Sequence, residues 1–244
     1  MSDNDPSIVT IVPTRGRPEA IGQLIHWFRR TTVIRSHELL VLVDNDDPML
    51  PDYLYEQNKL QRDDPQPNVT FWIGERAPIA RLLDDHSIRA CADYESTLRY
   101  VGFMGDDHRP RTPHWDQDIL TTPTPAIVYG DDLYQGVRLP TAVWMSTDII
   151  RAINKFCPPN CKHMELDSYW RDLGLATGTL KYIEGMIIEH LHPAAGKAQM
   201  DEGYARVGST EAYQADHLAY EQYRYSQGFA NDICAIMNMY NSKP

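Results

Sequence analysis

The sequence lacks any long apolar run: no stretch approaches the ~18 residues that a membrane-spanning helix needs. Its start, MSDNDPSIVT, lacks the basic and then apolar layout of a secretory signal. Cysteine is scarce, because four residues in 244 are too few for a disulfide scaffold at this length. We therefore expect a cytoplasmic protein in a reducing compartment, with no membrane span.

Basic residues are also in short supply, with 23 Lys and Arg against 34 Asp and Glu, which gives a formal net charge of −11. Neutralising a nucleic-acid backbone needs clustered Lys and Arg, and the longest basic pair here is Arg29-Arg30. The charge excludes a protein that coats nucleic acid, and the surplus of acid suits binding of a divalent cation. With 42% hydrophobic residues, the composition is that of a globular protein.

One short segment offers soft metal ligands, since Cys157, Cys161 and His163 lie within seven residues. A closed structural zinc site takes four ligands, and no fourth is evident nearby. We favour ordinary loop thiols over a metal site in this segment.

Short β-rich runs alternate with helical stretches along the chain. Between the first two runs, residues 17–30 carry apolar side chains at i, i+3, i+4 and i+7, which predicts a helix packed on a sheet. A second helix is expected at about 78–97. The alternation predicts an α/β fold with a mainly parallel sheet. The expected strands are 8–12, 38–43, 69–73, 100–104 and 126–129, and the Pro-rich segments 63–67 and 109–113 are expected to be loops.

Carboxylates gather where the predicted strands end. Asp44 follows the second strand, Asp106 and Asp107 follow the fourth, and Asp131 and Asp132 follow the fifth. In open α/β sheets the carboxyl edge is the ligand crevice. Asp also favours turns, and we interpret Asp131 and Asp132 as turn residues. Three acidic clusters on one edge nevertheless predict a site there.

Six segments, taken in order, resemble the nucleotide-sugar glycosyltransferases with the glycosyltransferase-A fold, most closely the family 2 type. The resemblance covers about residues 7 to 200 and implies a Rossmann-like α/β fold, with a mainly parallel sheet flanked by helices and a C-terminal helical segment. The segments are the loop 12–18, Asp44, the Ala80-Arg81 pair, the DXD-type motif at 103–108, the acidic motif at 165–171 and the late His segment at 189–193.

The resemblance also divides the chain. Residues 1–108 would form the nucleotide-sugar-binding half, 109–202 the acceptor-binding and catalytic half of the same domain, and 203–244 a C-terminal helical tail. In the tail, Ile233 and Ile236 belong to an apolar pattern with helical spacing, which predicts a helix packed on the body. Acceptor binding by the tail, or a homodimer formed through it, is the minor alternative.

A divalent cation, Mn²⁺ or Mg²⁺, is implied at the motif that contains Asp106 and Asp107. Such an ion would stabilise the charge that develops on the departing diphosphate. Asp107 is our choice of ligand, but because His108 follows it, Asp106 with His108 is the competing assignment. His190 and His192 would share one face of a strand, and one of them could complete the metal shell. Oxygen ligands with one or two imidazoles suit Mn²⁺ or Mg²⁺.

The donor is expected to be a nucleoside-diphosphate sugar, with a UDP-sugar as the first choice. The loop after the first strand carries guanidinium groups and backbone donors that could meet a base or a diphosphate. The acid after the second strand could accept from a ribose or base donor. The residues that the resemblance implies for donor binding are Pro13, Thr14, Arg15, Arg17, Asp44, Arg81, Asp106 and Lys197.

An inverting transfer needs a carboxylate that takes the proton from the acceptor hydroxyl. Asp167 is our choice, because it begins a predicted helix and a helix N-terminus favours the ionised form. Its alternative role is that of a helix N-cap. Glu165 is the second candidate for the base, because the family spacing, counted back from Arg171, fits it nearly as well.

The resemblance therefore implies a metal-dependent glycosyltransferase of the hexosyltransferase type, with an inverting mechanism as the first choice and a retaining mechanism left open. A nucleotidyltransferase would share the fold type and the acid pair, but no Gly-rich triphosphate loop follows the first strand. A catalytically silent nucleotide-sugar-binding module is the other alternative. The acceptor stays open among a protein, a glycan, a small molecule and a modified nucleic-acid base.

Overall fold

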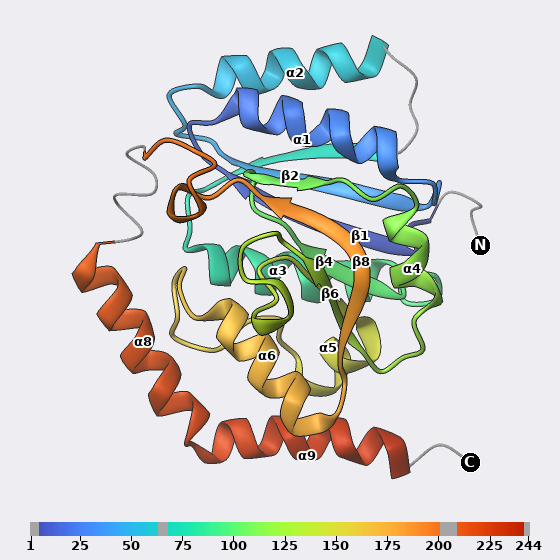
Figure 1. Cartoon of the computed structure of the whole chain (residues 1–244), viewed down its shortest axis with the longest axis vertical. Helices are drawn as coiled ribbons and strands as arrows, with labels where there is room; N and C mark the ends of the chain where they lie inside the picture. Colours follow the sequence, from blue (N-terminus) through green and yellow to red (C-terminus); the bar gives the residue numbers. More distant parts are fainter. Residues whose placement is uncertain (1–4, 63–67, 201–208, 242–244) are drawn as a thin grey trace.

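The computed structural model describes residues 5–62, 68–200 and 209–241, which form one mixed sheet with helices on both faces (Figure 1). None of the helices in these ranges is long and apolar enough to cross a membrane. The predicted α/β fold is confirmed. The strands are β1 (Ile8–Thr14), β2 (His37–Asp44), β3 (Asn68–Gly74), β4 (Tyr100–Phe103), β5 (His108–Pro110), β6 (Ile127–Asp131), β7 (Val143–Ser146) and β8 (Leu180–His190).

The strand order is β3-β2-β1-β4-β7-β6-β8-β5. Four neighbouring pairs are parallel, namely β1 with β2, β1 with β4, β2 with β3, and β6 with β8. The three antiparallel pairs all lie in the second half of the sheet: β4 with β7, β6 with β7, and β5 with β8. The sheet is therefore mainly parallel, and it runs through both predicted halves of the chain.

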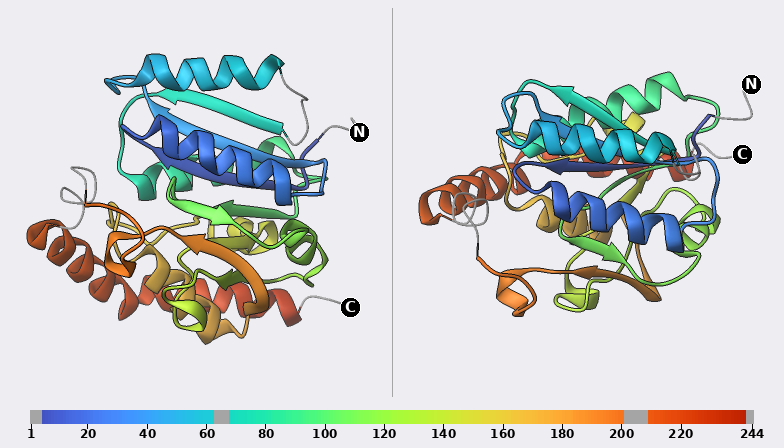
Figure 2. Two further views of the ribbon diagram at one scale, coloured as in Figure 1. Left: turned by 45° about the horizontal axis from the view of Figure 1, so that its top comes forward. Right: turned by 90° about the horizontal axis from the view of Figure 1, so that it is seen from above.

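Helices cover the sheet from both sides, as the two views of Figure 2 show. The predicted first helix is confirmed, with Pro18 in its first turn, where proline's fixed φ is tolerated. The predicted terminal helix is also present. The helices are α1 (Pro18–Thr31), α2 (Leu50–Arg62), α3 (Ile79–Asp93), α4 (Trp115–Thr121), α5 (Thr147–Ile153), α6 (Leu166–Thr177), α8 (Thr210–Arg224) and α9 (Gln227–Asn241), with short 3-10 turns η1 (Gly136–Arg138) and η2 (Pro193–Ala195).

The core consists of two layers because successive residues of a strand face opposite sides. In β1, Ile8 and Val12 belong to the layer formed with α1, α2 and α4. Val9 and Ile11 belong to the layer that contains α3, α5, α6 and the two C-terminal helices. The apolar stripe of α1 is buried as predicted, and Phe28 has no exposed surface.

Two predicted elements differ from the structure. The second helix ends at Asp93 rather than near residue 97, because Tyr94 leaves helical geometry and the N–H of Leu98 bonds back to its carbonyl in a turn that leads into β4. The Pro-rich segment 109–113, expected to be a loop, begins within β5, which pairs with β8. The other predicted Pro-rich loop, at 63–67, lies outside the described residues.

The carboxyl ends of β1, β2, β4 and β6 point to one edge of the sheet, on the left in Figure 1. The helix α6 leads into β8, whose first residue Leu180 lies level with the start of β6. The C-terminus of α6 is thus at the opposite edge, and its N-terminus faces the carboxyl ends of the strands. The acidic motif at the start of α6 is therefore on the side of the sheet where Asp44 and Asp106 lie.

Gly102 provides a test of packing in the strand that leads to the DXD-type motif. A Cβ at this position would lie 2.1 Å from Cδ1 of Trp144 in β7. We expect Gly102→Ala to lower the free energy of unfolding by about 1–3 kcal/mol, measured by urea denaturation. The control is Gly22→Ala on α1, where the added Cβ meets the flexible carboxylate of Glu56 and Ala favours the helix by up to about 1 kcal/mol. Equal losses in the two variants would contradict this packing.

Candidate functional site

The end of β1 and the turn after β4 are joined through Asp106. The parallel pairing places Ile11 level with Phe103, so the turn after β4 lies beside the loop after β1. Thr14 Oγ1 donates to Asp106 Oδ2 at 2.7 Å, and Arg17 Nη1 donates to Asp106 Oδ1 at 3.0 Å. Three residues that the sequence assigned to donor binding are thus in direct contact.

The loop between β1 and α1 is fixed by Tyr53 of α2. Its phenol oxygen accepts from the backbone N–H of Arg17 at 2.7 Å and lies 3.0 Å from Thr14 Oγ1. Burial raises the pKa of Tyr53 to about 12, so the phenol keeps its proton. Gly16 has a φ of +70°, a conformation that glycine adopts without strain, and its N–H donates to Asp47 at 2.7 Å.

Arg15 pairs with the carboxylates that follow β2. Its Nη1 lies 2.8 Å from Asp44 Oδ2 and 2.5 Å from Asp46 Oδ1. Pro13 is buried in β1 opposite Leu42 of β2. The two strand ends are therefore tied together by charge, and a ligand entering here would meet both a guanidinium group and carboxylates.

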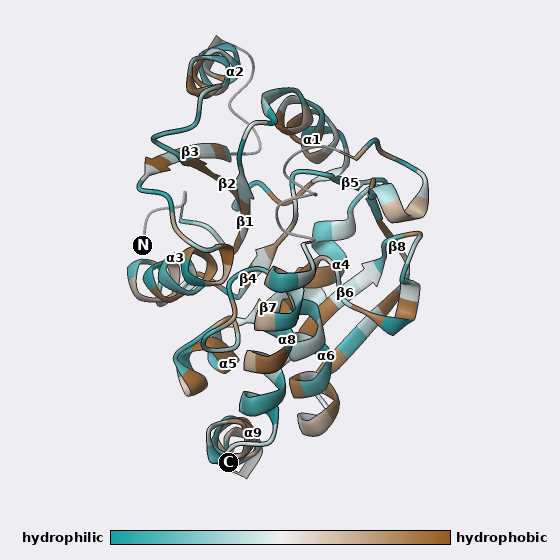
Figure 3. Ribbon diagram, turned by 90° about the vertical axis from the view of Figure 1, so that its left-hand side faces the viewer, coloured by the Kyte–Doolittle hydropathy of each residue, from teal (hydrophilic) through white to brown (hydrophobic). Residues whose placement is uncertain are grey.

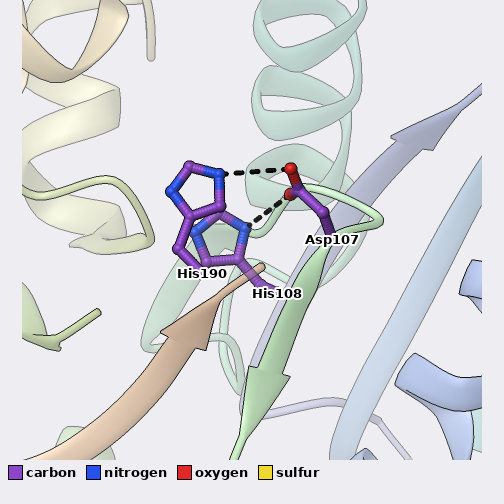
Figure 4. A group of neighbouring side chains, drawn as sticks. All are labelled: Asp107, His108 and His190. Atoms are coloured by element: carbon purple, nitrogen blue, oxygen red, sulfur yellow. Dashed lines mark hydrogen bonds and ion pairs between the residues drawn. The ribbon is translucent and has the colours of Figure 1, made fainter. Parts of the chain in front are cut away.

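Asp107, His108 and His190 come together where β8 ends (Figure 4). Asp107 Oδ2 lies 3.2 Å from His190 Nε2, and Asp107 Oδ1 lies 3.3 Å from His108 Nδ1. The two imidazole rings stack, with centroids 4.2 Å apart. Among the described residues, this is the one group of three or more His, Cys, Asp or Glu side chains that could hold a metal ion, because its candidate ligand atoms lie within 4.8 Å of one another.

Strand pairing brings these three residues together from distant parts of the sequence. In the β5–β8 ladder, His108 lies opposite His190. The N–H of Leu191 donates to the carbonyl oxygen of Asp107 at 2.9 Å, and the N–H of His190 donates to that of Asp132 at 3.0 Å. The backbone on both sides of His190 is thus fixed to the two acidic turns.

The adjacent acids Asp106 and Asp107 have opposite pKa shifts. Burial and the charge of Asp107 raise the pKa of Asp106 to about 6, against the opposing effect of Arg17 and Thr14. Burial also acts to raise the pKa of Asp107, but hydrogen bonds and charges from His108 and His190 outweigh it and hold this pKa well below the usual value. Asp107 is therefore the fully ionised member of the pair at neutral pH.

The two histidines also differ in charge. Burial lowers the pKa of His108, and the nearby His190 lowers it further. For His190, burial is outweighed by Asp107 and Asp132, which raise the pKa to about 9. In the metal-free protein at neutral pH, a protonated His190 therefore neutralises Asp107 and His108 is uncharged.

Asp132 is a turn residue, as expected from the sequence, and its carboxylate also lies near the ring of His190. Its Oδ1 accepts from the backbone N–H groups of residues 134–136 at 2.6–2.9 Å. Its Oδ2 accepts from Thr141 at 2.8 Å and lies 3.8 Å from His190 Nδ1, which is too far for a hydrogen bond. Burial opposes ionisation, but the hydrogen bonds outweigh it and lower the pKa of Asp132. A carboxylate thus stands behind His190.

The side chain of Arg109 fixes the backbone of the turn that contains Asp106 and Asp107. It is 3% exposed, and its Nη1 donates to the carbonyl oxygens of Asp106 and His108 at 2.8 and 2.7 Å. Its Nη2 donates to Gln23 of α1 at 3.2 Å. These hydrogen bonds fix the conformation of the DXD-type motif and attach it to α1.

Two further predicted residues lie near the end of β8. His192 was expected on the strand with His190, but β8 ends at His190, and His192 is the N-cap of η2, where its Nδ1 accepts from the N–H of Ala194 at 3.1 Å. Its ring lies 5.0 Å from that of His190. Lys197 Nζ lies 3.0 Å from Glu189. Metal binding by His192 and diphosphate binding by Lys197 stay predictions.

The acidic motif is tied to the Ala80-Arg81 pair. The N–H of Ala80, at the start of α3, donates to the carbonyl oxygen of Lys162 at 3.1 Å. The side chain of Arg81 is exposed and pairs with Asp85 on the same helix at 3.5 Å. The pair therefore lies beside the segment that leads to Glu165, and the Arg81 side chain extends into solvent.

Glu165 and Asp167 occupy the first turn of α6. The N-cap position belongs to Glu165, with a φ of 66°, so Asp167 does not have the N-cap role that the sequence left open. Asp167 Oδ1 accepts from the N–H of Ser168 at 2.8 Å, and burial raises the pKa of its carboxyl group. Glu165 Oε1 lies 2.8 Å from Nδ1 of His217 on α8.

Helix α8 is attached to the acidic motif at several points, and Figure 3 looks onto the edge where they meet. Asp216 is 4% exposed and accepts from the backbone N–H groups of residues 162–164 at 2.7–2.9 Å. Tyr220 donates to Asp172 at 2.8 Å, and Arg224 pairs with the same carboxylate at 3.1 Å. The C-terminal segment thus supports the start of α6 directly.

The thiols of Cys157 and Cys161 are buried, and burial raises the pKa of both. Cys161 Sγ contacts the carbonyl oxygen of Asp216 at 3.6 Å. The segment 157–163 therefore packs against α8 beside the acidic motif.

Sequence reasoning missed Tyr53, Arg109, Asp216 and His217 as supports of the site. Asp132 carried a signal, because it ends a strand beside two other acidic clusters. The four missed residues carry no such signal. Tyr53, Asp216 and His217 contact segments dozens of residues away, and Arg109 bonds to the nearby carbonyl oxygens of Asp106 and His108 as well as to the distant Gln23.

No family model and no curated protein matches the chain. Among solved structures, it is similar to mannosyltransferase PcManGT from Pyrobaculum calidifontis in complex with GDP-Man and Mn²⁺, at 14% identity and a TM-score of 0.59, covering 99% of this chain and 77% of that one. The 1–349 fragment of S. aureus TarS in complex with UDP-GlcNAc gives 10% identity and a TM-score of 0.57, with 96% and 72% covered. A longer TarS structure gives 11% and 0.55, and the chain spans 44% of its length.

Similarity at this level of identity establishes the fold. The chain has the glycosyltransferase-A type of fold that the sequence motifs predicted. In open α/β sheets ligands bind at the carboxyl ends of the strands, and in this chain that edge carries Thr14, Asp106 and the Asp107–His108–His190 group.

Replacing Asp216 tests whether α8 supports the acidic motif. We expect Asp216→Ala to lower the free energy of unfolding by roughly 2–4 kcal/mol, because the N–H groups of residues 162–164 lose a buried, charged acceptor. Thermal or urea denaturation measures the loss. The exposed neighbour Gln214 is the control, and Gln214→Ala should stay within about 0.5 kcal/mol of the parent. A similarly small change in Asp216→Ala would show that the hydrogen bonds between Asp216 and residues 162–164 contribute little to stability.

Proposed function

We propose that the protein is a divalent-metal-dependent glycosyltransferase of the hexosyltransferase type, which moves a sugar from a nucleoside-diphosphate sugar to an acceptor hydroxyl with inversion. The observation that carries this proposal is the Asp107–His108–His190 group at the carboxyl edge of a glycosyltransferase-A sheet. An anionic diphosphate has few protein cations to meet at this edge, because Arg15 and Arg17 are already paired with acids. A bound cation would supply the missing positive charge.

The ligand atoms fit a divalent cation. One carboxylate and two imidazoles form a mixed oxygen and nitrogen set, which suits Mn²⁺ better than Mg²⁺, since Mg²⁺ prefers oxygen alone. His190 Nδ1 is buried without a hydrogen-bond partner and faces Asp132 at 3.8 Å. A carboxylate behind a ligating histidine orients the ring and favours metal binding by the other nitrogen. Asp107, His108 and His190 would hold the ion.

When bound, the ion would neutralise the charge that develops on the leaving diphosphate. The protein's own groups would do the rest. Asp106, held by Thr14 and Arg17, would accept from a ribose hydroxyl, and Asp44 beside Arg15 would contact the base or the ribose. Arg81 at the start of α3 and Lys197 after β8 are the two proposed cations that would approach the phosphates from outside.

Asp167 is our proposed base, with Glu165 as the alternative. Asp167 lies in the first turn of α6 and Glu165 is the N-cap, so both are near the helix N-terminus, where the helix dipole favours a carboxylate. The raised pKa of Asp167 gives this carboxyl group a greater affinity for a proton than an ordinary aspartate has, as a general base requires. The carboxylate of Glu165 is hydrogen-bonded to His217, which fixes its orientation.

Metal-dependent nucleotide binding is the first test of this proposal. GDP or UDP at about 100 times its dissociation constant should stabilise the protein by roughly 2.7 kcal/mol when Mn²⁺ is present, which corresponds to a rise in Tm of about 5–10 °C. The stabilisation should disappear in EDTA, and in Asp107→Ala and His190→Ala with Mn²⁺. Thermal denaturation measures all four conditions.

Asp131→Asn is the matched control, because Asp131 belongs to the same edge but caps its own turn through the N–H of Leu133. Asp131→Asn should keep the full Mn²⁺-dependent rise in Tm on nucleotide binding. Equal stabilisation with Mn²⁺ and with EDTA would remove the metal-bridged mode of binding. Normal binding by Asp107→Ala, with loss in Asp106→Ala and His108→Ala, would instead support the Asp-x-His assignment.

The base is tested by isosteric variants. Asp167→Asn should lower turnover by roughly 10²–10⁴-fold, because an amide cannot take the acceptor proton, while the nucleotide and Mn²⁺ still raise Tm. Glu165→Gln should cause a mild loss. A severe loss at Glu165 and a mild one at Asp167 would move the base to Glu165, and unchanged turnover in both would end the inverting mechanism.

The reaction products distinguish glycosyl transfer from nucleotidyl transfer, which a similar site could also catalyse. When the protein is incubated with GDP-Man, UDP-GlcNAc or other nucleotide sugars, it should release the nucleoside diphosphate. Chromatography of the reaction mixture measures this product. Release of pyrophosphate from a sugar phosphate and a nucleoside triphosphate would identify a nucleotidyltransferase instead.

A further inference from the structure

Helix α8 lies along the edge of the sheet at which the proposed transfer would take place (Figures 1 and 3). Its inner face is fully used in binding the protein body, since Asp216 and Tyr220 are both buried and hydrogen-bonded to the acidic motif and to α6. The side chains beside this face are therefore held in a defined position relative to Glu165.

Two of these neighbouring side chains form a flat aromatic surface. The rings of Tyr213 and His217, one helical turn apart, lie nearly parallel, with an interplanar angle of 6° and centroids 5.9 Å apart. Tyr213 is 45% exposed, and the side chain of His217 is 52% exposed. About half of each side chain is therefore in contact with water, where a ligand could reach it.

The aromatic surface adjoins the proposed catalytic carboxylates. His217 Nδ1 lies 2.8 Å from Glu165 Oε1, and Glu165 is two residues from Asp167 in the first turn of α6. Apolar ring faces next to carboxylates match the two kinds of surface of a pyranose. Its C–H face packs on aromatic rings, and its hydroxyl groups donate to carboxylate oxygens.

We propose that Tyr213 and His217 form an acceptor subsite for a pyranose ring, so that the acceptor is a glycan or glycoside. This inference rests on the proposed function and specifies its acceptor. A base of a nucleic acid also stacks on aromatic rings, but the phosphates of the nucleic-acid backbone would meet Glu165, Asp167 and a net charge of −11. A neutral sugar encounters no such repulsion.

Saturation-transfer NMR on the whole protein tests the subsite with defined probes: methyl α-D-mannopyranoside, methyl β-D-glucopyranoside and the methyl glycoside of N-acetylglucosamine. The samples contain Mn²⁺ and GDP or UDP. At least one glycoside should receive saturation from the wild-type protein. Tyr213→Ala should weaken its binding about 3- to 10-fold, the scale of one aromatic stacking contact, whereas Tyr213→Phe should bind as the wild type does.

Tyr225→Ala is the matched control, because Tyr225 is 78% exposed and, as the C-cap of α8, lies about two helical turns beyond His217. It should leave glycoside binding unchanged. His217→Ala should weaken binding as Tyr213→Ala does, and Tm measured for each variant shows that it is folded.

Binding that is equal in Tyr213→Ala and wild type would overturn the subsite, as would saturation of uridine or adenosine with none of the three glycosides. The nucleotide-dependent rise in Tm, measured on the same samples, separates the two proposals. If this rise is present and no glycoside binds, the subsite is wrong and the proposed function stands. If the rise is absent, the proposed function fails whatever the glycosides do.

Discussion

The antiparallel pairing of β5 with β8 is the contact on which the Asp107–His108–His190 group depends. It places His108 opposite His190 across 82 residues of sequence, and the adjoining backbone bonds from residues 190 and 191 fix the register at its end. Because side chains alternate along a strand, a slip of one residue would turn His190 to the other face of the sheet. The group would then lose one of its two imidazoles.

At the same edge, the adjacent residues Asp106 and Asp107 have different surroundings and opposite pKa shifts. Asp106 is surrounded by donors from the loop after β1, in a position where burial dominates its pKa. Asp107 faces two imidazoles that keep it ionised. Residues next to each other in sequence thus point to different partners, and the division agrees with a ribose contact for one and a cation contact for the other. Tyr53 and Arg109 maintain this division by fixing the two loops.

Much of this arrangement could be predicted, because it depends on local pattern. The apolar stripe of α1, the β-rich runs and the acids after them are properties of short segments, and parallel pairing places the strand ends together. Short or irregular elements were missed: β7 has four residues, and β5 overlaps a Pro-containing segment. The partnership of Asp216 with residues 162–164 depends on how a distant helix docks, and no local pattern reports it.

The attachment of α8 has a consequence for the entropy of catalysis. Aligning an acceptor hydroxyl with a base normally requires that translational and rotational freedom be lost during binding. Here the aromatic pair and the carboxylates are joined through Asp216, Tyr220 and His217 before any ligand arrives. The ordering of these protein groups is completed when the chain folds, so an acceptor that docks on α8 would lose only its own freedom.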